Sequence, residues 1–385
     1  MRAAFERRVA PLLALGESAE ALALACRDMA ERFTAGGRLL VFGTGVGATD
    51  AAHVAVEFVH PVTVGKRALP ALALPDDDFA HQVRTLGRPA DIALGFCGTG
   101  SPRVEAGLRA ARSAGLLTVA LAGSGGECDA EHCLTIASSD PLIVKEGHVT
   151  AYHLLWELVH VFFESPSGAA DGPASGVEQL YPFLYGGGTS ASSVLDAAAD
   201  SARQKVAEVV TLRREVGAAY GDALAGCASE LAAAFAAGAT LYAFGNGGSS
   251  TDASAVVHAF LHPCGPVDPL PAVCLAADVA VLTALSNDVG FDVTFARQIR
   301  AFGRPGDIAV GISTSGGSPN VLAGLEEAKR VGMVTVGLSG YGGGRMADLT
   351  ALDHLFAVPS PSVHRVQEVQ TTLYHVLWEA TRGRD

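Results

Sequence analysis

Short apolar runs bounded by glycine-rich turns recur along both halves of this chain. Runs of this length that are apolar throughout predict strands of a parallel sheet covered on both faces. Alanine-rich segments with helical spacing alternate with them, so we predict doubly wound α/β domains with long helices at their ends. The runs are Leu39–Phe42, Ile92–Phe96 and Leu116–Leu121 in the first half, and Leu241–Phe244, Ile308–Ile312 and Val334–Leu338 in the second.

The two halves are copies of one unit, because four blocks recur in the same order. The blocks of copy one begin at Phe42, Gly87, Ala106 and Tyr152, and those of copy two begin at Phe244, Gly303, Ala323 and Tyr374. The offset between copies rises from 202 at the first block to 216 at the second. Copy two therefore carries a segment, which includes residues 284–291, that copy one has largely lost.

The composition break between the copies lies in residues 164–193, which are rich in Ser, Gly, Pro and Ala. We predict an N-terminal domain over residues 1–170, a linker over 171–193 and a C-terminal domain over 194–385. With 385 residues, of which 49% are hydrophobic and 17% charged, each half is large enough to bury its own core. Extended disorder over most of the length is excluded.

Charge and cysteine content narrow the partners and the compartment. A formal net charge of −13 argues against nucleic acid or an anionic membrane as a partner. No export signal or apolar segment of membrane-spanning length is evident, and seven scattered cysteines predict no disulfide framework. We therefore expect a cytoplasmic protein. Cys128, His132 and Cys133 suggest zinc, but no second ligand cluster accompanies them, so we do not expect zinc there.

Two loops in copy two have the composition of a phosphate site. Residues 244–250 read Phe-Gly-Asn-Gly-Gly-Ser-Ser after a strand. The glycines let the backbone approach a ligand, and Ser249 can cap or touch that ligand. Within residues 311–321, positions 313–318 bring four hydroxyls and two glycines directly before Pro319, which suits the first turn of a helix behind a Ser318 cap. Backbone N–H groups and hydroxyls could hold a phosphate there. The alternative is a capped turn without a ligand.

The sequence Ser-Thr-Ser-Gly-Gly-Ser at 313–318, with residues 245–249, 286–288 and 365–368, resembles the sugar isomerase (SIS) domain, and most closely the phosphoheptose isomerases. The resemblance covers nearly all of copy two and, more loosely, copy one. It implies an α/β fold of two tandem flavodoxin-like SIS domains, each a parallel sheet flanked by helices. It also implies a sugar-phosphate ligand, no nucleotide cofactor, and a homodimer of two-domain chains that corresponds to the family's usual homotetramer. The substrate-binding residues it implies are Asn246, Ser249, Asp288, Ser313, Thr314, Ser315, Ser318 and Gln367.

The family pattern also places a His and a Glu four residues apart on the helix after the glycine loop. In copy one these positions are His53 and Glu57, which lie one helical turn apart on the same face. The equivalent positions in copy two are Ala255 and Ala259. The alternative to a functional pair is a buried histidine with Glu57 as its structural hydrogen-bond partner.

A Gln and a His eight residues apart on the last helix complete the family pattern. They are Gln367 and His375 in copy two, whereas copy one has Lys145 and His153. Some family members hold zinc with the four residues, and the Glu and the second His are the expected acid–base pair. The residues this implies as zinc ligands are His53, Glu57, Gln367 and His375. Eight residues span roughly 12 Å along a helix, so His375 is the safer assignment and Gln367 could contact only substrate.

Neither copy has the whole set, which predicts one composite site between the domains. In that site His53 and Glu57 of copy one meet Gln367, His375 and the phosphate loop of copy two. The alternative takes all groups from copy one, namely His53, Glu57 and His153, with its shortened loop at residues 97–102. In either case we expect Lys145 to be a solvated or salt-bridging side chain.

The reaction implied is the conversion of sedoheptulose 7-phosphate to D-glycero-D-manno-heptose 7-phosphate through an enediol(ate). Glu57 would act as the base at carbon and His375 as the acid–base group at oxygen. Bound zinc would polarise the carbonyl, but a metal-bound Glu57 would be a weaker base, so the two roles compete. Asp288 is either a turn residue or a substrate contact. The alternative functions are a non-catalytic sugar-phosphate regulator and an isomerase of another ketose phosphate.

Overall fold

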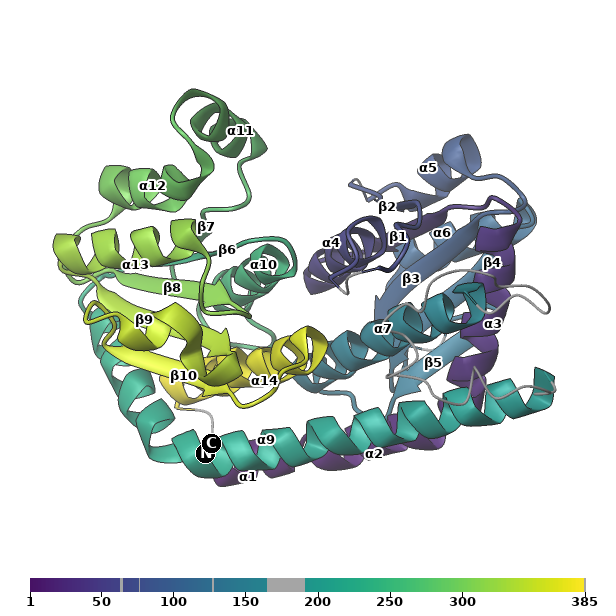
Figure 1. The fold of residues 1–385 in the computed structure, drawn as a ribbon, viewed down its shortest axis with the longest axis horizontal. Helices are drawn as coiled ribbons and strands as arrows, with labels where there is room; N and C mark the ends of the chain where they lie inside the picture. Colours follow the sequence, from purple (N-terminus) through teal and green to yellow (C-terminus); the bar gives the residue numbers. More distant parts are fainter. Residues whose placement is uncertain (63–64, 76, 127, 165–190, 384–385) are drawn as a thin grey trace. The chain divides into compact units, whose positions relative to one another are not determined.

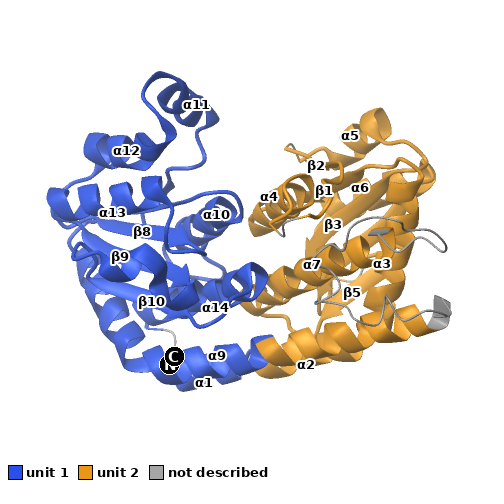
Figure 2. Ribbon diagram, in the orientation of Figure 1, with its two compact units in different colours: residues 1–8, 209–385 blue, residues 9–208 orange. Residues whose placement is uncertain are grey.

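The computed structural model describes residues 1–62, 65–75, 77–126, 128–164 and 191–383, which form two compact units (Figure 2). Unit 1 combines residues 1–8 with 209–385, and unit 2 comprises residues 9–208. This division differs from the predicted domain limits of 170 and 194. Helix α9 (Ala191–Ala236) continues from one unit into the other, and Arg8 of the first segment pairs with Glu379 in unit 1 at 3.0 Å. Most of the predicted linker lies outside the described residues.

Unit 2 contains a five-stranded parallel sheet in the order β2-β1-β3-β4-β5 (Figure 1). Its strands are β1 (Leu39–Gly43), β2 (Ala71–Ala73), β3 (Ile92–Gly98), β4 (Leu117–Gly123) and β5 (His132–Ile136). Its helices are α2 (Val9–Glu17), α3 (Ala19–Thr34), α4 (Val46–Val59), α5 (Phe79–Leu86), α6 (Pro102–Ser113), α7 (Pro141–Glu164) and the first part of α9. The strand order is that of flavodoxin-like folds, as predicted.

Unit 1 repeats the same sheet with the order β7-β6-β8-β9-β10. Its strands are β6 (Leu241–Gly245), β7 (Ala272–Cys274), β8 (Ile308–Ser313), β9 (Val334–Gly340) and β10 (His354–Val358). Its helices are α1 (Arg2–Glu6), the rest of α9, α10 (Gly248–Leu261), α11 (Val279–Asp288), η2 (Phe291–Val293), α12 (Thr294–Phe302), α13 (Pro319–Val331), η3 (Tyr341–Asp348) and α14 (Val363–Thr381). The segment that copy one lacks falls on α11 and η2.

All six apolar runs form strands, which confirms the predicted parallel sheets. The buried core of each unit uses equivalent residues: Phe42 stacks on Phe79 at 5.1 Å in unit 2, and Phe244 meets Phe295 at 5.1 Å in unit 1. In each unit the first strand turns into a helix through a glycine in the left-handed region, with φ +53° at Gly247. That turn places the helix start beside the carboxyl ends of the strands.

Among the described residues no single helix is long and apolar enough to cross a membrane. The bent pair formed by Arg2–Glu17 and Ala19–Thr34 passes on length and composition only when its two parts are taken together.

Candidate functional site

A carboxylate and two imidazoles meet in the interior of unit 2. Helix α4 presents His53 and Glu57, whose Nε2 and Oε1 atoms lie 3.6 Å apart, and α7 presents His153. All three side chains are at most 2% exposed. One nitrogen or carboxylate oxygen from each residue lies within 4.8 Å of the others, so the three could hold a metal ion. The structure thus brings together the one-copy set His53, Glu57 and His153.

Neighbouring aromatic side chains hold this group in place. The Tyr152 ring lies 5.1 Å from the His53 ring and 4.8 Å from the His153 ring. The Trp156 indole Nε1 donates a hydrogen bond of 2.8 Å to the Glu57 carbonyl oxygen. These contacts tie α4 to α7 directly beside the triad, which restricts the motion of its side chains.

A buried ion pair lies on the same two helices. The Lys145 ammonium of α7 pairs with the Asp50 carboxylate of α4, three residues before His53. Burial raises the pKa of Asp50, and Lys145 opposes that rise. Burial also lowers the pKa of His148, one turn along α7, to about 3, so this histidine is neutral. Lys145 was expected to be either solvated or in a salt bridge, and the structure shows the salt bridge. The sequence did not indicate that the Lys145 side chain is buried.

Helix α10 of unit 1, the counterpart of α4, lacks the His and Glu and has Ala255 and Ala259 at those positions. Gln367 and His375 are buried on α14 as expected of a site helix, and Tyr374 donates a hydrogen bond of 3.4 Å to Asp252 of α10. Asp252 is the counterpart of Asp50 in the repeat. The predicted ligand set is therefore divided, with His53 and Glu57 in unit 2 and Gln367 and His375 in unit 1.

The serine loop of unit 1, residues 313–318, connects β8 to the start of α13. Ser313 Oγ lies 3.0 Å from Ser318 Oγ and 3.4 Å from Ser315 Oγ. Helix α13 begins at Pro319 with Ser318 as its N-cap residue, as predicted. The Ser318 hydroxyl makes no capping bond, so three serine hydroxyls gather at the N-terminal end of α13, where the helix dipole favours an anion. Thr314 contributes its carbonyl, which accepts from Gly340 N at 2.9 Å.

The glycine loop packs beside the serine loop through a reciprocal amide pair. Asn246 Nδ2 donates to Asn320 Oδ1 at 2.8 Å, and Asn320 Nδ2 donates to Asn246 Oδ1 at 2.9 Å. Asn320 is buried on α13 and was not predicted as a site residue. Ser249 is not the helix cap, because α10 already begins at Gly248. Asp288 is exposed at the end of α11 and accepts a 2.8 Å hydrogen bond from Asn287.

In unit 2 a disulfide joins the end of β3 to the loop after β4. The bonded residues are Cys97 and Cys128. The prediction of no disulfide framework did not anticipate this bond. Its two cysteines are 31 residues apart in the sequence, and nothing in their spacing indicated that they pair. His132, which belongs to the rejected zinc cluster, has its Nε2 atom 2.8 Å from Asp28 Oδ2.

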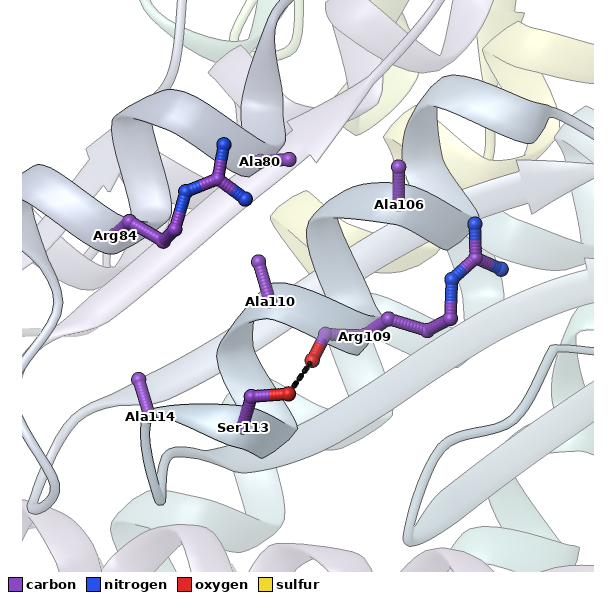
Figure 3. A pocket seen from close by; sticks show the side chains of 7 residues that line it. All are labelled: Ala80, Arg84, Ala106, Arg109, Ala110, Ser113 and Ala114. Atoms are coloured by element: carbon purple, nitrogen blue, oxygen red, sulfur yellow. Dashed lines mark hydrogen bonds between the residues drawn. The ribbon is translucent and has the colours of Figure 1, made fainter.

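A groove of about 540 Å³ lies elsewhere in unit 2, between α5 and α6. Figure 3 shows two arginines and several small side chains along it, and the Ser113 hydroxyl donates to the Arg109 carbonyl at 2.9 Å. The lining residues are Ala80, Arg84, Ala106, Arg109, Ala110, Ser113 and Ala114. None of them belongs to the triad or to the serine loop, so we do not assign the site here.

Comparison with known proteins identifies relatives of this chain. A family model described as the SIS domain matches residues 206–340. A phosphoheptose isomerase of Desulfovibrio desulfuricans is 43% identical over 188 residues, which cover 48% of this chain and 88% of the relative. One from Aquifex aeolicus is 40% identical over 161 residues, which cover 42% of this chain and 83% of the relative.

A solved structure resembles nearly the whole chain in fold. Tagatose-6-phosphate ketose/aldose isomerase from Escherichia coli has a TM-score of 0.60 at 12% identity. The match covers 99% of this chain and 92% of that one. At this identity the similarity concerns the fold alone, and it agrees with two tandem parallel-sheet units in this chain.

Proposed function

Because this chain belongs to the phosphoheptose isomerase family of SIS-domain proteins, we propose that it is a sugar-phosphate isomerase. The specific reaction we propose converts sedoheptulose 7-phosphate to D-glycero-D-manno-heptose 7-phosphate through an enediol(ate). The observation that carries the proposal is the buried carboxylate with two imidazoles in unit 2, whose potential ligand atoms lie within 4.8 Å of one another.

The chemistry needs a base at carbon and an acid–base group at oxygen. Glu57 removes the proton from C1 of the ketose while an imidazole protonates the oxygen on C2. The same imidazole then takes the proton from the oxygen on C1, and Glu57 returns a proton to C2. Burial of the group keeps water away and strengthens these interactions.

The imidazole has two candidates. His153 lies beside Glu57 within unit 2, and this proximity favours it. The composite site predicted from the sequence takes His375 instead, and with it Gln367 as a substrate contact. Separate His153→Asn and His375→Asn variants distinguish the candidates, because only loss of the participating imidazole lowers kcat by the 10²–10⁴-fold typical of acid–base groups.

The phosphate of the substrate is proposed to bind the serine loop of unit 1. Ser313 and Ser318 place their hydroxyls 3.0 Å apart at the start of α13, where N–H groups and the helix dipole favour an anion. Such a site needs no lysine or arginine, which suits a chain with a net charge of −13. The other contacts proposed for the substrate are Thr314, Ser315, Asn246, Ser249 and Asp288.

A zinc ion fits the triad by its donor set. Two imidazoles and a carboxylate match the ligands of catalytic zinc sites, which keep a fourth position open. When bound there, zinc would polarise the substrate carbonyl as a Lewis acid. His53, Glu57 and His153 would hold it, whereas the ligand set implied by the family resemblance uses Gln367 and His375. Since coordination weakens Glu57 as a base, isomerisation by metal-free and zinc-loaded protein separates the two roles.

The direct test is incubation with sedoheptulose 7-phosphate and a panel of other ketose phosphates, with separation of ketose from aldose. Conversion of sedoheptulose 7-phosphate in preference to the panel supports the proposal. Conversion of another ketose phosphate alone would change the substrate, and binding without conversion would indicate a sugar-phosphate regulator. Light scattering on the same sample tests the proposed homodimer.

A further inference from the structure

The disulfide in unit 2 stands out against the other cysteines of the chain. Cys26, Cys133, Cys227 and Cys274 remain thiols, whereas Cys97 and Cys128 are joined. A chain that keeps most of its thiols reduced does not rely on disulfides for its framework. In such chains an isolated disulfide is more often transient and redox-responsive than structural.

The internal repeat shows what the disulfide replaces. Cys97 occupies the position of Ser313, the first hydroxyl of the serine loop in unit 1. In unit 1 the loops after β8 and β9 are held together by backbone hydrogen bonds, including Met346 N to Gly316 O at 2.9 Å. In unit 2 the equivalent loops are joined covalently through Cys128. The cross-link therefore fixes the part of unit 2 that corresponds to the proposed phosphate cradle.

The cross-link is also in physical contact with the surroundings of the triad. Phe96, the residue before Cys97, has its ring 6.1 Å from the ring of Tyr152. The Tyr152 ring in turn contacts both imidazoles, tilted against that of His53 and edge-on to that of His153. A change in the backbone at Cys97 thus has a route of two packed ring contacts to the two imidazoles.

We propose that Cys97 and Cys128 form a thiol–disulfide exchange site whose oxidation state is transmitted to the His53–Glu57–His153 group. Cys128 is the entry cysteine, since it is partly exposed, whereas Cys97 is only 2% exposed. The oxidant is a low-molecular-weight disulfide. The Cys128 thiolate attacks one of its sulfurs and releases a thiolate, and the Cys97 thiolate then attacks the Cys128 sulfur of the mixed disulfide. The second thiolate leaves, two electrons have passed to the oxidant, and a dithiol reverses the sequence.

The exchange chemistry is tested with Cys97→Ser and Cys128→Ser chains, both carrying Cys264→Ser to remove an exposed cysteine. Reduced protein is mixed with oxidised glutathione, and modified peptides are quantified by mass spectrometry. Cys128 should form a stable mixed disulfide about tenfold faster than Cys97 does in the reciprocal variant. Chains carrying only Cys264→Ser should instead close the Cys97–Cys128 bond. Equal rates, or failure of that bond to form, would overturn the proposal.

Transmission is tested by NMR of the His53 and His153 ring signals, assigned with His→Asn variants. Reduction should shift both signals in the wild type. The shift should be at least about twofold smaller in Phe96→Leu, because this change removes the ring that contacts Tyr152. Identical spectra of the oxidised and reduced wild type would contradict transmission. Any effect on turnover rests on the proposed isomerase function, but the mass and NMR readouts do not. A protein that shows both and isomerises nothing therefore disproves the function and leaves the redox site standing.

Discussion

Replacing Lys145 by Gln should destabilise unit 2 strongly and in a pH-dependent way. Lys145 and Asp50 are 3% and 1% exposed and pair with each other. Removal of one partner from a buried ion pair costs about 3–5 kcal/mol, because the remaining charge is uncompensated. Gln is the residue at the equivalent position of unit 1, Gln367, so this side chain is compatible with the fold. The double variant with Asp50→Asn should recover most of the loss.

The pH dependence follows from Asp50. Burial raises its pKa above the ordinary 3.8, and Lys145 acts against that rise. Without Lys145 the folded-state pKa of Asp50 rises further. A carboxyl whose pKa is raised on folding stabilises the fold at low pH, and this contribution disappears as the pH rises through the folded-state pKa. The loss in Lys145→Gln should therefore be smaller at about pH 4 than at about pH 7.5.

Urea unfolding followed by tryptophan fluorescence measures this effect. Each unit has one tryptophan, Trp156 in unit 2 and Trp378 in unit 1. All variants are therefore made with Trp378→Phe, so that the signal reports unit 2. A loss for Lys145→Gln that is equal at both pH values, or a double variant as unstable as the single one, would refute the reasoning.

Three further predictions concern single residues. His148→Gln places at this position the residue that unit 1 has there, Gln370, and should make unit 2 more resistant to acid. The folded-state pKa of His148 is about 3, so the buried neutral imidazole costs the fold stability as the pH falls below 6.5. An unchanged acid-unfolding midpoint would contradict this. Ser313→Ala should weaken binding of sedoheptulose 7-phosphate about tenfold in calorimetry while leaving thermal stability nearly unchanged, and unaltered affinity would remove Ser313 from the phosphate site. Gly247→Ala should lower the stability of unit 1 by about 1–2 kcal/mol because the φ of Gly247 is +53°. The control is Gly226→Ala in α9, where a Cβ has open space, and this change should be neutral or stabilising. Equal effects of the two variants in urea unfolding would rule out backbone strain as the cause.

Much of the fold was predictable because it depends on local patterns that occur twice. The apolar runs gave the six inner strands, and the repeat gave the two units. The edge strands β2, β5, β7 and β10 were missed. Strands β2 and β7 have three residues each, and β5 and β10 have five residues each and begin with a histidine. The unit boundary could not be placed because α9 is one continuous helix of 46 residues and no sequence signal marks its passage between units.

The candidate triad was anticipated only as one of two alternatives, the set taken from copy one. His53 and Glu57 are implied by the family resemblance, and their spacing of one helical turn places them on the same face. His153 joins them because α4 packs against α7, and such a contact between residues about a hundred positions apart cannot be derived from periodicity. The Asp50–Lys145 pair and the Cys97–Cys128 bond are long-range in the same sense. The repeat did contain a signal for Asp50, since Asp252 occupies the equivalent position.

The central claim, that Glu57 moves the carbon-bound proton of a sugar phosphate, is tested by isomerisation in deuterated water. Mass spectrometry of substrate and product reports deuterium gained at the carbon next to the carbonyl. The wild type should convert sedoheptulose 7-phosphate and incorporate deuterium, while Glu57→Gln should bind the substrate with similar affinity and do neither. Conversion and deuterium incorporation by Glu57→Gln at the wild-type rate would contradict the claim.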